Sequence, residues 1–563
     1  MAFLTFNYSS AQTVTGVVSD EYGAIPGATV VVKGTTTGTT TGFTGKYTLD
    51  VELPATLVAS FVGYNSVELE VSDSNKDAAD FNLRQGINFD EIIVLGTRAS
   101  NRTNLESPVP VDVIDVSKIS RAAPQTSINQ LMHMTAPSFS SNTQTISDGT
   151  DHIDPAALRG LGPDQVLVLV NGKRRHTTSL VNVNGTFGRG SVGTDLNAIP
   201  ASAIQKIEVL RDGAAAQYGS DAIAGVINLQ LKETVNELNF NMTTGAHMTS
   251  EIGAFDGEEK SIDGEVFNLG ANYGIPLNEN GGLISLTAEM DVRNPTNRML
   301  EFEGGIFNQL NGIERLAAAD GLDVTQLTIG DIQNYAGDVG YISSTDLDAI
   351  NSAGSIDDIT GILGDDATDA ELAARGQDRT DYNMRVGQSE LRGGKLFANV
   401  SIPINDDTEF YAFGGTSYRR GSSGCFYRLP SQARTMTSIY LNGTVPKINS
   451  NINDRSVGAG IRGLAGKWNM DLSAVSGSNR FLFHITDTHN ATLGTSSPTD
   501  FDAGGHQFAQ TTANLDLSRY FDNVEGIKGI NLAYGAEFRS ENFKIIEGTE
   551  SSWGNYDVNG NLV

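Results

Sequence analysis

Apolar and polar residues alternate with a period of two over much of this chain, a pattern that predicts β-strands. In residues 12–86 the alternating segments are short, as in VTGVVSD, ATVVVKG and GKYTLDV. Pro26-Gly27 and the Gly/Thr-rich stretch 34–45 supply turns between them. About seven short strands in a segment of this length predict a small β-sandwich.

Residues 99–233 mix strand, helix and turn signals, which predicts an α+β domain. Val166–Val170 is a continuous apolar run, typical of a strand that is covered on both faces. Asn171-Gly172 follows it directly, and both residues tolerate the positive φ of a tight turn. The segment SINQLMHM predicts a short helix.

Residues 234–563 return to alternation, now in segments of about ten residues, and we expect about ten strands there. Short turns such as 278–282 and 405–408 alternate with long connections, of which the acidic, Gly-rich loop 297–390 is the longest. Unequal connections combined with such strands are typical of an outer-membrane β-barrel. A soluble β-sandwich would give similar alternation.

Composition narrows the class of protein. The 563 residues contain 38 basic and 67 acidic side chains, a net charge of -29, which argues against non-specific nucleic-acid binding. A hydrophobic content of 39% is too high for a disordered chain. No stretch reaches the roughly 18 apolar residues of a membrane helix, so a membrane would be crossed by strands.

The residue pattern gives little support for catalysis or metal binding. The single cysteine, Cys425, excludes an internal disulfide framework and any cysteine-cluster zinc site. The seven histidines are scattered, and the N-terminal domain contains neither a histidine nor a Ser/His/Asp set. We therefore expect no catalytic residues, no metal site and no cofactor. An enzyme with an accessory N-terminal domain would need a catalytic set that the sequence does not offer.

Two short segments near the start have alternative interpretations. Residues 1–11 (MAFLTFNYSSA) are either the end of a secretion signal or an ordinary first strand. Residues 90–98 place β-prone side chains after two acids, within the linker 87–98. This segment could add a strand to the edge of another protein's sheet, or it could be one more internal strand.

Several motifs resemble those of known families. The N-terminal domain is similar to carboxypeptidase-regulatory-like domains, on the series Gly16, Asp20, Gly23, Pro26-Gly27-Ala28, Gly34-Thr35, Gly38, Thr44, Gly45 and Tyr47. Residues 99–233 resemble the plug domain of TonB-dependent outer-membrane receptors. That resemblance rests on motifs in the family's order and spacing: Pro155–Gly162, Gln165–Lys173, Asp195–Pro200, Ile204–Gly213 and Ala214–Leu229.

The resemblance implies roles for individual residues. The TonB box, which TonB of the TonB–ExbB–ExbD complex binds, would be Glu91, Ile92, Ile93, Val94 and Leu95. Plug arginines Arg159 and Arg211 would pair with barrel carboxylates as a latch, with Glu537 as one candidate partner. Structural plug positions would be Gly160, Asn171, Gly172, Gly213, Tyr218, Gly219 and Gly225, and candidate cargo-binding residues would be Asp148, Asp151, His152, Arg174 and Arg175.

The implied function is an outer-membrane receptor, surrounded by lipid, for energy-coupled import of a scarce nutrient. The resemblance does not identify the cargo, because variable loops set specificity. The candidate cargoes are a siderophore, cobalamin, a peptide and an oligosaccharide. The N-terminal domain is similar to that of Bacteroidota receptors, including SusC-like glycan importers, which leaves a surface lipoprotein open as a further partner. The alternative from another class is a surface-exposed β-sandwich adhesin or interaction protein without transport.

The strand count raises one further expectation. The family closes its barrel with about 22 strands, whereas ten strands enclose too little space for a plug. An open half-barrel would leave unpaired sheet edges in lipid. We therefore expect this sequence to be the N-terminal part of a longer receptor, interrupted within its barrel.

Overall fold

In the computed structural model the chain divides into two compact units, Met1–Val94 with Asn101–Pro108 and Leu95–Ser100 with Val109–Val563. The structure describes residues 11–20, 23–33, 35, 37–61, 67–83, 111–122, 125–183, 185–211, 214–250, 261–277, 282–405, 407–522 and 529–563. The fold is mostly β, as the sequence predicts.

The N-terminal unit consists of two small sheets that enclose one apolar core. One sheet holds β1 (Gln12–Asp20), β2 (Gly23–Ala24), β5 (Lys46–Val51) and β8 (Phe81–Asn82). The other holds β3 (Thr29–Val32), β4 (Gly38–Thr40), β6 (Ala55–Ser60) and β7 (Val67–Val71). Alternate residues of β1 and β5, such as Val14, Val18 and Leu49, are buried between the sheets. The period-two pattern therefore gives the predicted sandwich.

The plug region is built around a five-stranded sheet in the order β13-β12-β15-β14-β9. These strands are β9 (Val111–Asp115), β12 (Val166–Val170), β13 (Lys173–Arg174), β14 (Ile204–Leu210) and β15 (Gly225–Leu231). All five residues of β12 are buried, in agreement with its continuous apolar run. Around this sheet lie β10 (Phe139–Ser140), β11 (Ala157–Leu158), α1 (Val116–Ala122), α2 (Ile128–Thr135) and α3 (Ala215–Tyr218).

A nine-stranded antiparallel sheet follows, in which each strand pairs with its neighbours in sequence. Its strands are β16 (Leu238–Met248), β17 (Ile262–Pro276), β18 (Leu283–Arg293), β19 (Glu390–Asn405), β20 (Thr408–Gly424), β21 (Lys447–Ala465), β22 (Trp468–Thr486), β23 (Phe501–Asp522) and β24 (Gly529–Ile546). The described residues form nine strands, in agreement with the expected number of about ten, and WNMDLSAVSG and RFLFHITDT form the single strand β22. Gly477, the last residue of the first of these segments, pairs with Ser456 of β21 and Gln510 of β23.

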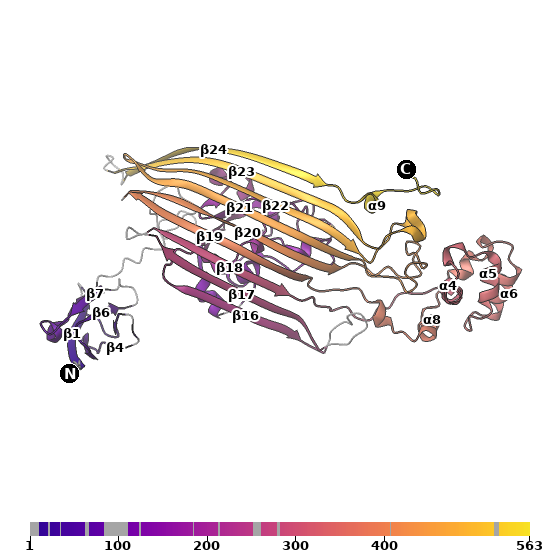
Figure 1. The fold of residues 1–563 in the computed structure, drawn as a ribbon, viewed down its shortest axis with the longest axis horizontal. Coiled ribbons are helices and arrows are strands. Elements are labelled where there is room, and N and C mark those ends of the chain that lie inside the picture. Colours follow the sequence, from indigo (N-terminus) through magenta and orange to yellow (C-terminus); the bar gives the residue numbers. More distant parts are fainter. Residues whose placement is uncertain are drawn as a thin grey trace, which may run out of the picture. The chain divides into compact units, whose positions relative to one another are not determined.

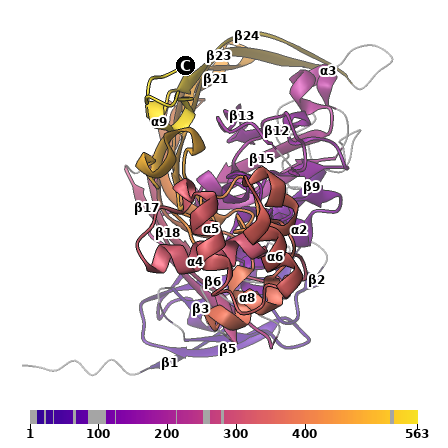
Figure 2. The same ribbon diagram turned by 90° about the vertical axis from the view of Figure 1, so that its right-hand side faces the viewer.

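The sheet has a polar inner face and an apolar outer face. In β18, Ser285, Thr287 and Glu289 are buried, whereas Leu286 and Met290, at alternating positions, are nearly half exposed. The plug elements lie against the concave face of this sheet (Figure 2). This arrangement places polar side chains toward the plug and a band of apolar side chains on the opposite face, as in a membrane-spanning barrel wall.

Connections differ in length at the two ends of the sheet. At one end, β19–β20 and β21–β22 are joined by two residues each, whereas β18–β19 and β20–β21 are joined at the other end by residues 294–389 and 425–446. The predicted long loop 297–390 is largely helical, which corrects that prediction (Figure 1). It contains α4 (Gln309–Ala319), α5 (Ile329–Ala336), α6 (Ser344–Ser352), α7 (Thr360–Leu363) and α8 (Thr368–Arg375).

The helical insert, as we call α4 to α8, owes its structure to local caps and a small core. Asn308 and Asn311 form a capping box on α4, and Thr328 and Asp331 form one on α5. The core contains Ile313, Ile332, Ala336, Val339, Ile342, Ile350, Ile359 and Leu363. A last short helix, α9 (Glu550–Trp553), follows β24. Among the described residues, no helix has the length and hydropathy needed to cross a bilayer.

Candidate functional site

The plug core continues directly into the inner face of the nine-stranded sheet. Phe397, Tyr411, Phe413 and Val475, from β19, β20 and β22, belong to the same apolar cluster as plug residues of β12, β14 and β15. Around this apolar centre, buried charged residues of the plug meet charged residues of the strands. We call this set of polar contacts the plug seat.

Asp454 of β21 is the centre of the first group in the plug seat. Arg175 and His176, which follow β13, both bind its carboxylate, with His176 Nε2 at 3.0 Å from Oδ2. Asn479 of β22 donates to the same oxygen at 3.0 Å. The Arg175, His176 and Asp454 side chains are at most 5% exposed. The buried carboxylate is therefore fully partnered, and removing it would leave Arg175 as an uncompensated buried charge.

Close packing brings the His176 ring against the strand. A Cβ atom at Gly477 would lie 2.1 Å from His176 Nδ1, so a side chain there would displace the ring. Burial lowers the pKa of His176, the neighbouring Arg175 lowers it further, and the carboxylates of Asp454 and Asp195 oppose the shift. The direction of the shift favours the neutral ring.

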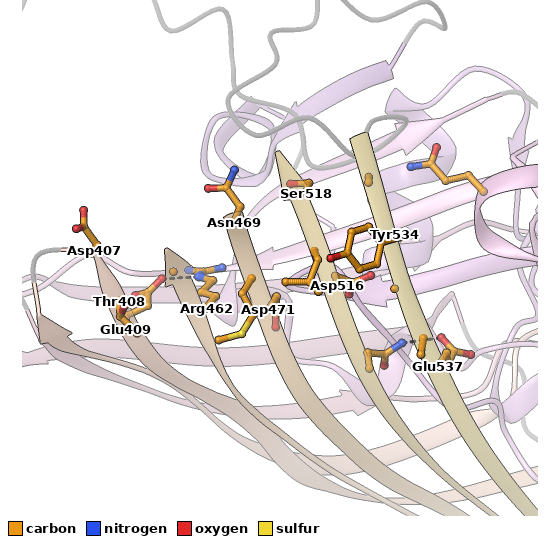
Figure 3. A pocket seen from close by; sticks show the side chains of 18 of the residues that line it. Asp407, Thr408, Glu409, Arg462, Asn469, Asp471, Asp516, Ser518, Tyr534 and Glu537 are labelled. Carbon is orange, nitrogen blue, oxygen red and sulfur yellow. Dashed lines mark hydrogen bonds and ion pairs between the residues drawn. The ribbon is translucent and has the colours of Figure 1, made fainter. Parts of the chain in front are cut away.

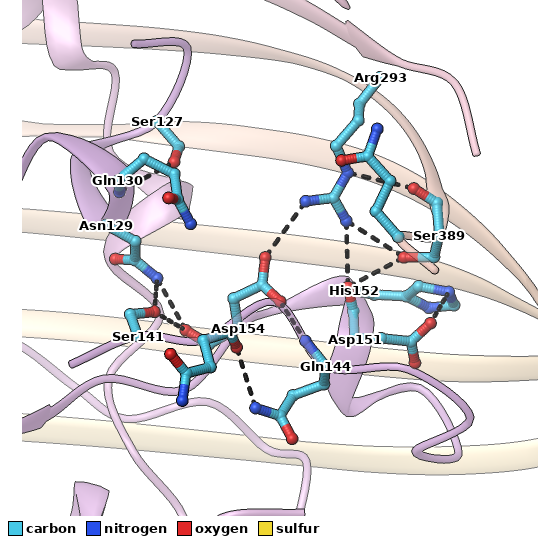
Figure 4. Close-up of polar contacts among 12 residues, drawn as sticks. Ser127, Asn129, Gln130, Ser141, Gln144, Asp151, His152, Asp154, Arg293 and Ser389 are labelled. Carbon is cyan, nitrogen blue, oxygen red and sulfur yellow. Dashed lines mark hydrogen bonds and ion pairs between the residues drawn. The ribbon is translucent and has the colours of Figure 1, made fainter. Parts of the chain in front are cut away.

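Arg293 of β18 organises the second group (Figure 4). Its guanidinium donates to Asp154 Oδ2 at 3.2 Å and to the backbone oxygen of Asp151 at 3.1 Å. Ser389 Oγ donates to the same Asp151 oxygen at 2.9 Å. The backbone N–H of Gln144 donates to the other Asp154 oxygen. One arginine of the sheet therefore holds two points of the plug segment 144–154.

His152 lies between these two groups and is completely buried. Its Nδ1 is 2.7 Å from Ser450 Oγ of β21, and its ring stacks on Phe481 of β22 at an interplanar angle of 10°. Gly421 of β20 lies against the ring, since a Cβ there would approach to 2.4 Å. Burial lowers the pKa of His152, and the charge of Asp151 opposes that shift.

Two further ion-pair groups complete the seat. Arg419 of β20 binds Asp195 of the plug, and burial raises the pKa of that carboxyl. Glu289 of β18 accepts from both the backbone and the hydroxyl of Ser202 at 3.0 and 2.8 Å. Lys395 of β19 donates to Glu289 at 2.8 Å. The plug is thus tied to strands β18 to β22 by buried, charge-assisted hydrogen bonds.

A cavity lies beside the plug, toward the end of the sheet with the short turns (Figure 3). It has a volume of about 1100 Å³ and is lined by residues of α3 and of β19 to β24. Lys173 lies 3.0 Å from Asp471 and 3.8 Å from Asp516 in its wall, and Arg462 pairs with Glu409. The cavity wall mixes apolar and polar surface and is rich in carboxylates.

The two arginines that were expected to form a latch with carboxylates of the sheet lie in a pair within the plug and in an exposed turn. Arg211 pairs with Asp112 inside the plug, because the β14–β9 register sets Leu210 opposite Val111 at that end of the two strands. Arg159 is exposed in a turn, with a φ of 57°. Glu537 accepts a hydrogen bond from Asn514 of the adjacent strand at 2.8 Å. The structure therefore corrects the assignment of Arg211 as a partner of a sheet carboxylate. The residues of the plug seat, and not Arg211, join the plug to the sheet.

The expected cargo residues divide into two sets. Asp151, His152 and Arg175 are buried in the plug seat, and Arg174 pairs with Asp221 at 2.5 Å within the plug, so these four are structural contacts. Asp148 alone is half-buried, beside the connection between β20 and β21. The strand residues of the seat were missed because polar side chains on alternate strand positions carry no local signal of a partner.

The expected structural positions of the plug are mostly turns. Asn171 and Gly172 have φ of 49° and 77° and link β12 to β13. Asn171 also donates to Asn399 of β19 at 3.0 Å, which adds a contact to the sheet. A Cβ at Gly225 would lie 2.3 Å from a backbone oxygen of β14. Gly160 and Gly219 also have positive φ, and Tyr218 is the last residue of α3. Gly213 lies outside the described residues. The expected TonB box, Glu91, Ile92, Ile93, Val94 and Leu95, also lies outside them.

Comparison with protein families agrees with this geometry. Residues 103–226 match the TonB-dependent Receptor Plug Domain, and residues 14–94 match the CarboxypepD_reg-like domain. The chain contains the plug domain of a TonB-dependent receptor. TonB-dependent receptors are proteins of the outer membrane and not enzymes.

Individual relatives match over limited lengths. The ferric enterobactin receptor PirA of Pseudomonas aeruginosa is 29% identical over 196 residues, which cover 34% of this chain and 26% of that receptor. A TonB-dependent receptor of Formosa agariphila is 29% identical over 263 residues, covering 44% of this chain and 24% of the relative. The vitamin B12 transporter BtuB of Vibrio cholerae is 34% identical over 119 residues, covering 21% and 16%.

Solved structures match at lower identity. The siderophore receptor PirA from Acinetobacter baumannii aligns with a TM-score of 0.46 and 15% identity, over 77% of this chain and 48% of that one. The alcaligin receptor FauA from Bordetella pertussis aligns with a TM-score of 0.40 and 11% identity, over 80% and 51%. The chain thus spans about half the length of these receptors.

Proposed function

We propose that this receptor imports a scarce nutrient across the outer membrane, driven by TonB and the inner-membrane proton gradient. The observation that carries the proposal is the plug seat. A folded domain is held against the polar face of a strand wall by buried ion pairs, and the other face of that wall is apolar. A domain held in this way closes a passage and can be released, because breaking a few specific contacts frees it.

Glu91–Leu95 is the proposed site of TonB binding. Five β-prone residues led by an acid suit strand addition, in which backbone hydrogen bonds provide affinity. Among the described residues, the first plug element after this segment is β9, an edge strand that pairs only with β14. Tension on residues 91–95 would therefore act on β9 first.

The proposed cargo is a siderophore, cobalamin, a peptide or an oligosaccharide. Relatives named for ferric enterobactin and vitamin B12 support the first two classes. The cavity beside the plug, whose wall carries several carboxylates, offers a route toward the end of the sheet with the short turns once the plug moves. TonB of the TonB–ExbB–ExbD complex and outer-membrane lipid are the proposed partners, and a surface lipoprotein is a further one.

The test is uptake in the organism that carries the gene. Cells lacking the gene are supplied with one labelled cargo class at a time, and uptake is compared with cells expressing the chain or its Ile93→Pro variant. Proline removes a backbone N–H that strand addition needs. We expect at least one cargo to enter only with the unchanged chain, and its uptake to stop when the proton gradient is collapsed. Equal uptake with Ile93→Pro would contradict the proposal.

A further inference from the structure

The strand wall separates its charges by sign between its two faces. In β20, β21, β22 and β24, outward positions alternate with inward positions that face the plug. The inward positions carry carboxylates, for example Asp454, Asp471 and Glu537. The outward positions of these four described strands carry no carboxylate, and their cations are Arg420, Arg455, Arg480 and Lys544, which we call the outer basic cluster. In a chain with a net charge of -29, this segregation needs a physical explanation.

The cations of the outer basic cluster lack a counter-charge within the described part of the chain. None of the four has a described carboxylate within 4.0 Å, and all four side chains are exposed. Arg392 of β19, directly opposite Arg420 in the register, differs because it pairs with Glu390 at 2.7 Å. Like charges on one face of a sheet repel one another, so the cluster favours a bound anion.

The strand register places members of the cluster within the span of one headgroup. Arg480 lies opposite Asn453, and Arg455 is the next outward residue of that strand, so the two arginines are diagonal neighbours about 7–8 Å apart. Lys544 is two strands from Arg480 in the same row, because Gln507 pairs with both, which corresponds to about 10 Å. Long basic side chains reach across such gaps. Two anionic groups of one ligand can therefore be bound together.

The cluster lies at the height of a membrane interface. Trp468, at the other end of β22, is also outward, and its ring centroid is 5.3 Å from that of Tyr534. Leu472 and Val457, between the two levels, are 53% and 60% exposed. From Trp468 to Arg480 the strand runs for about 40 Å, or roughly 30 Å of height at a tilt of about 40°. This height matches the hydrocarbon thickness of a bilayer, so the aromatic pair and the cluster lie at opposite interfaces.

The connections identify the leaflet that the cluster faces. The cluster is toward the end of the sheet with the long connections 294–389 and 425–446, whereas Trp468 follows the two-residue turn between β21 and β22. Outer-membrane barrels have long loops outside the cell and short turns in the periplasm. The outer basic cluster therefore lies at the headgroup level of the outer leaflet.

We propose that the outer basic cluster binds a lipid of the outer leaflet whose headgroup carries two phosphates. The phosphates accept charge-assisted hydrogen bonds from the guanidinium groups, and the acyl chains lie along outward apolar residues such as Val457 and Phe538. A zwitterionic headgroup would bring a positive charge beside the arginines, and one phosphate would leave part of the cluster without a counter-charge. The site is separate from cargo binding, and it rests on the membrane location of the wall in the proposed function.

Titration of the detergent-purified chain with diphosphoryl lipid A in mixed micelles tests the proposal. We expect saturable binding that weakens as the salt concentration rises, because exposed charges are screened. Monophosphoryl lipid A should bind about tenfold more weakly, and phosphatidylcholine should not bind saturably. Inorganic phosphate at an equal phosphate concentration should not compete, since it lacks acyl chains. Full competition by inorganic phosphate would show a general phosphate site and contradict lipid recognition.

Variants locate the site on the wall. The double variant Arg455→Gln and Arg480→Gln should weaken lipid A binding about tenfold or more, whereas Arg455→Lys and Arg480→Lys together should retain most of it, because the charges remain. Arg519→Gln is the matched control, since Arg519 lies on the same face beside Trp468 at the other interface, and it should leave binding unchanged. Equal thermal unfolding of the two double variants without lipid would show that the loss concerns binding and not folding.

Two results would overturn the proposal. They are equal affinity for diphosphoryl and monophosphoryl lipid A, and unchanged lipid A binding in the double glutamine variant. Lipid A binding without uptake that depends on Ile93 would keep the lipid site and remove transport. Such uptake without lipid A binding would remove only the lipid site.

Discussion

Arg211 binds Asp112 within the plug, with Arg211 Nε 2.5 Å from Asp112 Oδ2, at the end of β9 where the chain enters the plug. The pair joins the edge strand β9 to β14, next to the Leu210–Val111 register position. Tension applied from residues 91–95 would reach this contact before any other part of the plug sheet. Under the proposed function, the pair therefore holds the strand that tension would release first.

Asp112→Asn should loosen β9 selectively. The two side chains are 28% and 34% exposed, so the pair contributes about 1 kcal/mol or less to the free energy of opening. Amide hydrogen exchange in β9 should become about two- to fivefold faster, with exchange in β12 unchanged. Lys118→Gln, which removes an exposed pair with Asp115, is the control and should change little. Unaltered exchange in β9 would mean that its other contacts hold it.

Asp454→Asn should loosen the plug from the sheet. The substitution leaves Arg175 buried without its counter-charge, which costs about 3–5 kcal/mol when one partner of a buried pair is removed. Denaturant unfolding followed by proteolysis of the plug measures this loss. Asp369→Asn, which alters a pair with Arg379 that is 86% exposed on the carboxylate side, is the control and should lower the free energy of unfolding by much less. Similar losses in both variants would contradict the assignment of Asp454 to the plug seat.

Gly477→Ala should act on the same contact by displacement. Its Cβ would lie 2.1 Å from His176 Nδ1, so the ring must move away from Asp454. Gly394→Ala is the matched control, since the nearest atom to a Cβ there is 3.8 Å away. We expect Gly477→Ala to lower the melting temperature and Gly394→Ala to leave it nearly unchanged. A melting temperature unaffected by Gly477→Ala would show that the ring does not need its present position.

Acidification should weaken the plug seat through His176. The folded-state pKa of this ring is lowered from 6.5 by burial and by Arg175, against the opposing charges of Asp454 and Asp195. The unfolded ring therefore binds a proton more readily, and stability that is fully present above about pH 6.5 is lost as the pH falls below it. Melting temperatures at about pH 7.5 and 5.5 measure the effect.

The His176→Gln variant identifies the source of that pH dependence. It should show a smaller loss of melting temperature between the two pH values than the unchanged chain. His133→Gln removes an exposed histidine of α2 and should leave the difference as it is. If His176→Gln retained the full pH dependence, another group would be responsible.

Much of the fold follows from local sequence signals. The alternation in β18 places Leu286 and Met290 on one face and Thr287 and Glu289 on the other, as period two requires. The turn at Asn171-Gly172 has the positive φ values that these residues favour. In contrast, Gly477 suggests a break between two strands, but its lack of a side chain is needed where His176 packs against the continuous strand β22.

The plug seat itself could not be predicted from the sequence. Asp454 and Arg175 are 279 residues apart, and only the register of nine strands brings them together. Arg211 was assigned to the sheet because its motif suggests a latch, whereas the pairing of β14 with β9 brings Asp112 closer. The helical insert was missed although capping pairs such as Thr328 and Asp331 precede its helices, because its acidic, Gly-rich composition resembles that of a loop.

The central claim is that TonB engages Glu91–Leu95 to move this plug. A photo-crosslinking amino acid at position 93 tests it directly in cells, with the same group at position 43, where Phe43 is 98% exposed in the N-terminal domain, as the control. The account predicts a TonB adduct from position 93 that Ile92→Pro abolishes, and none from position 43. No adduct at position 93, or an adduct that Ile92→Pro leaves unchanged, would contradict it.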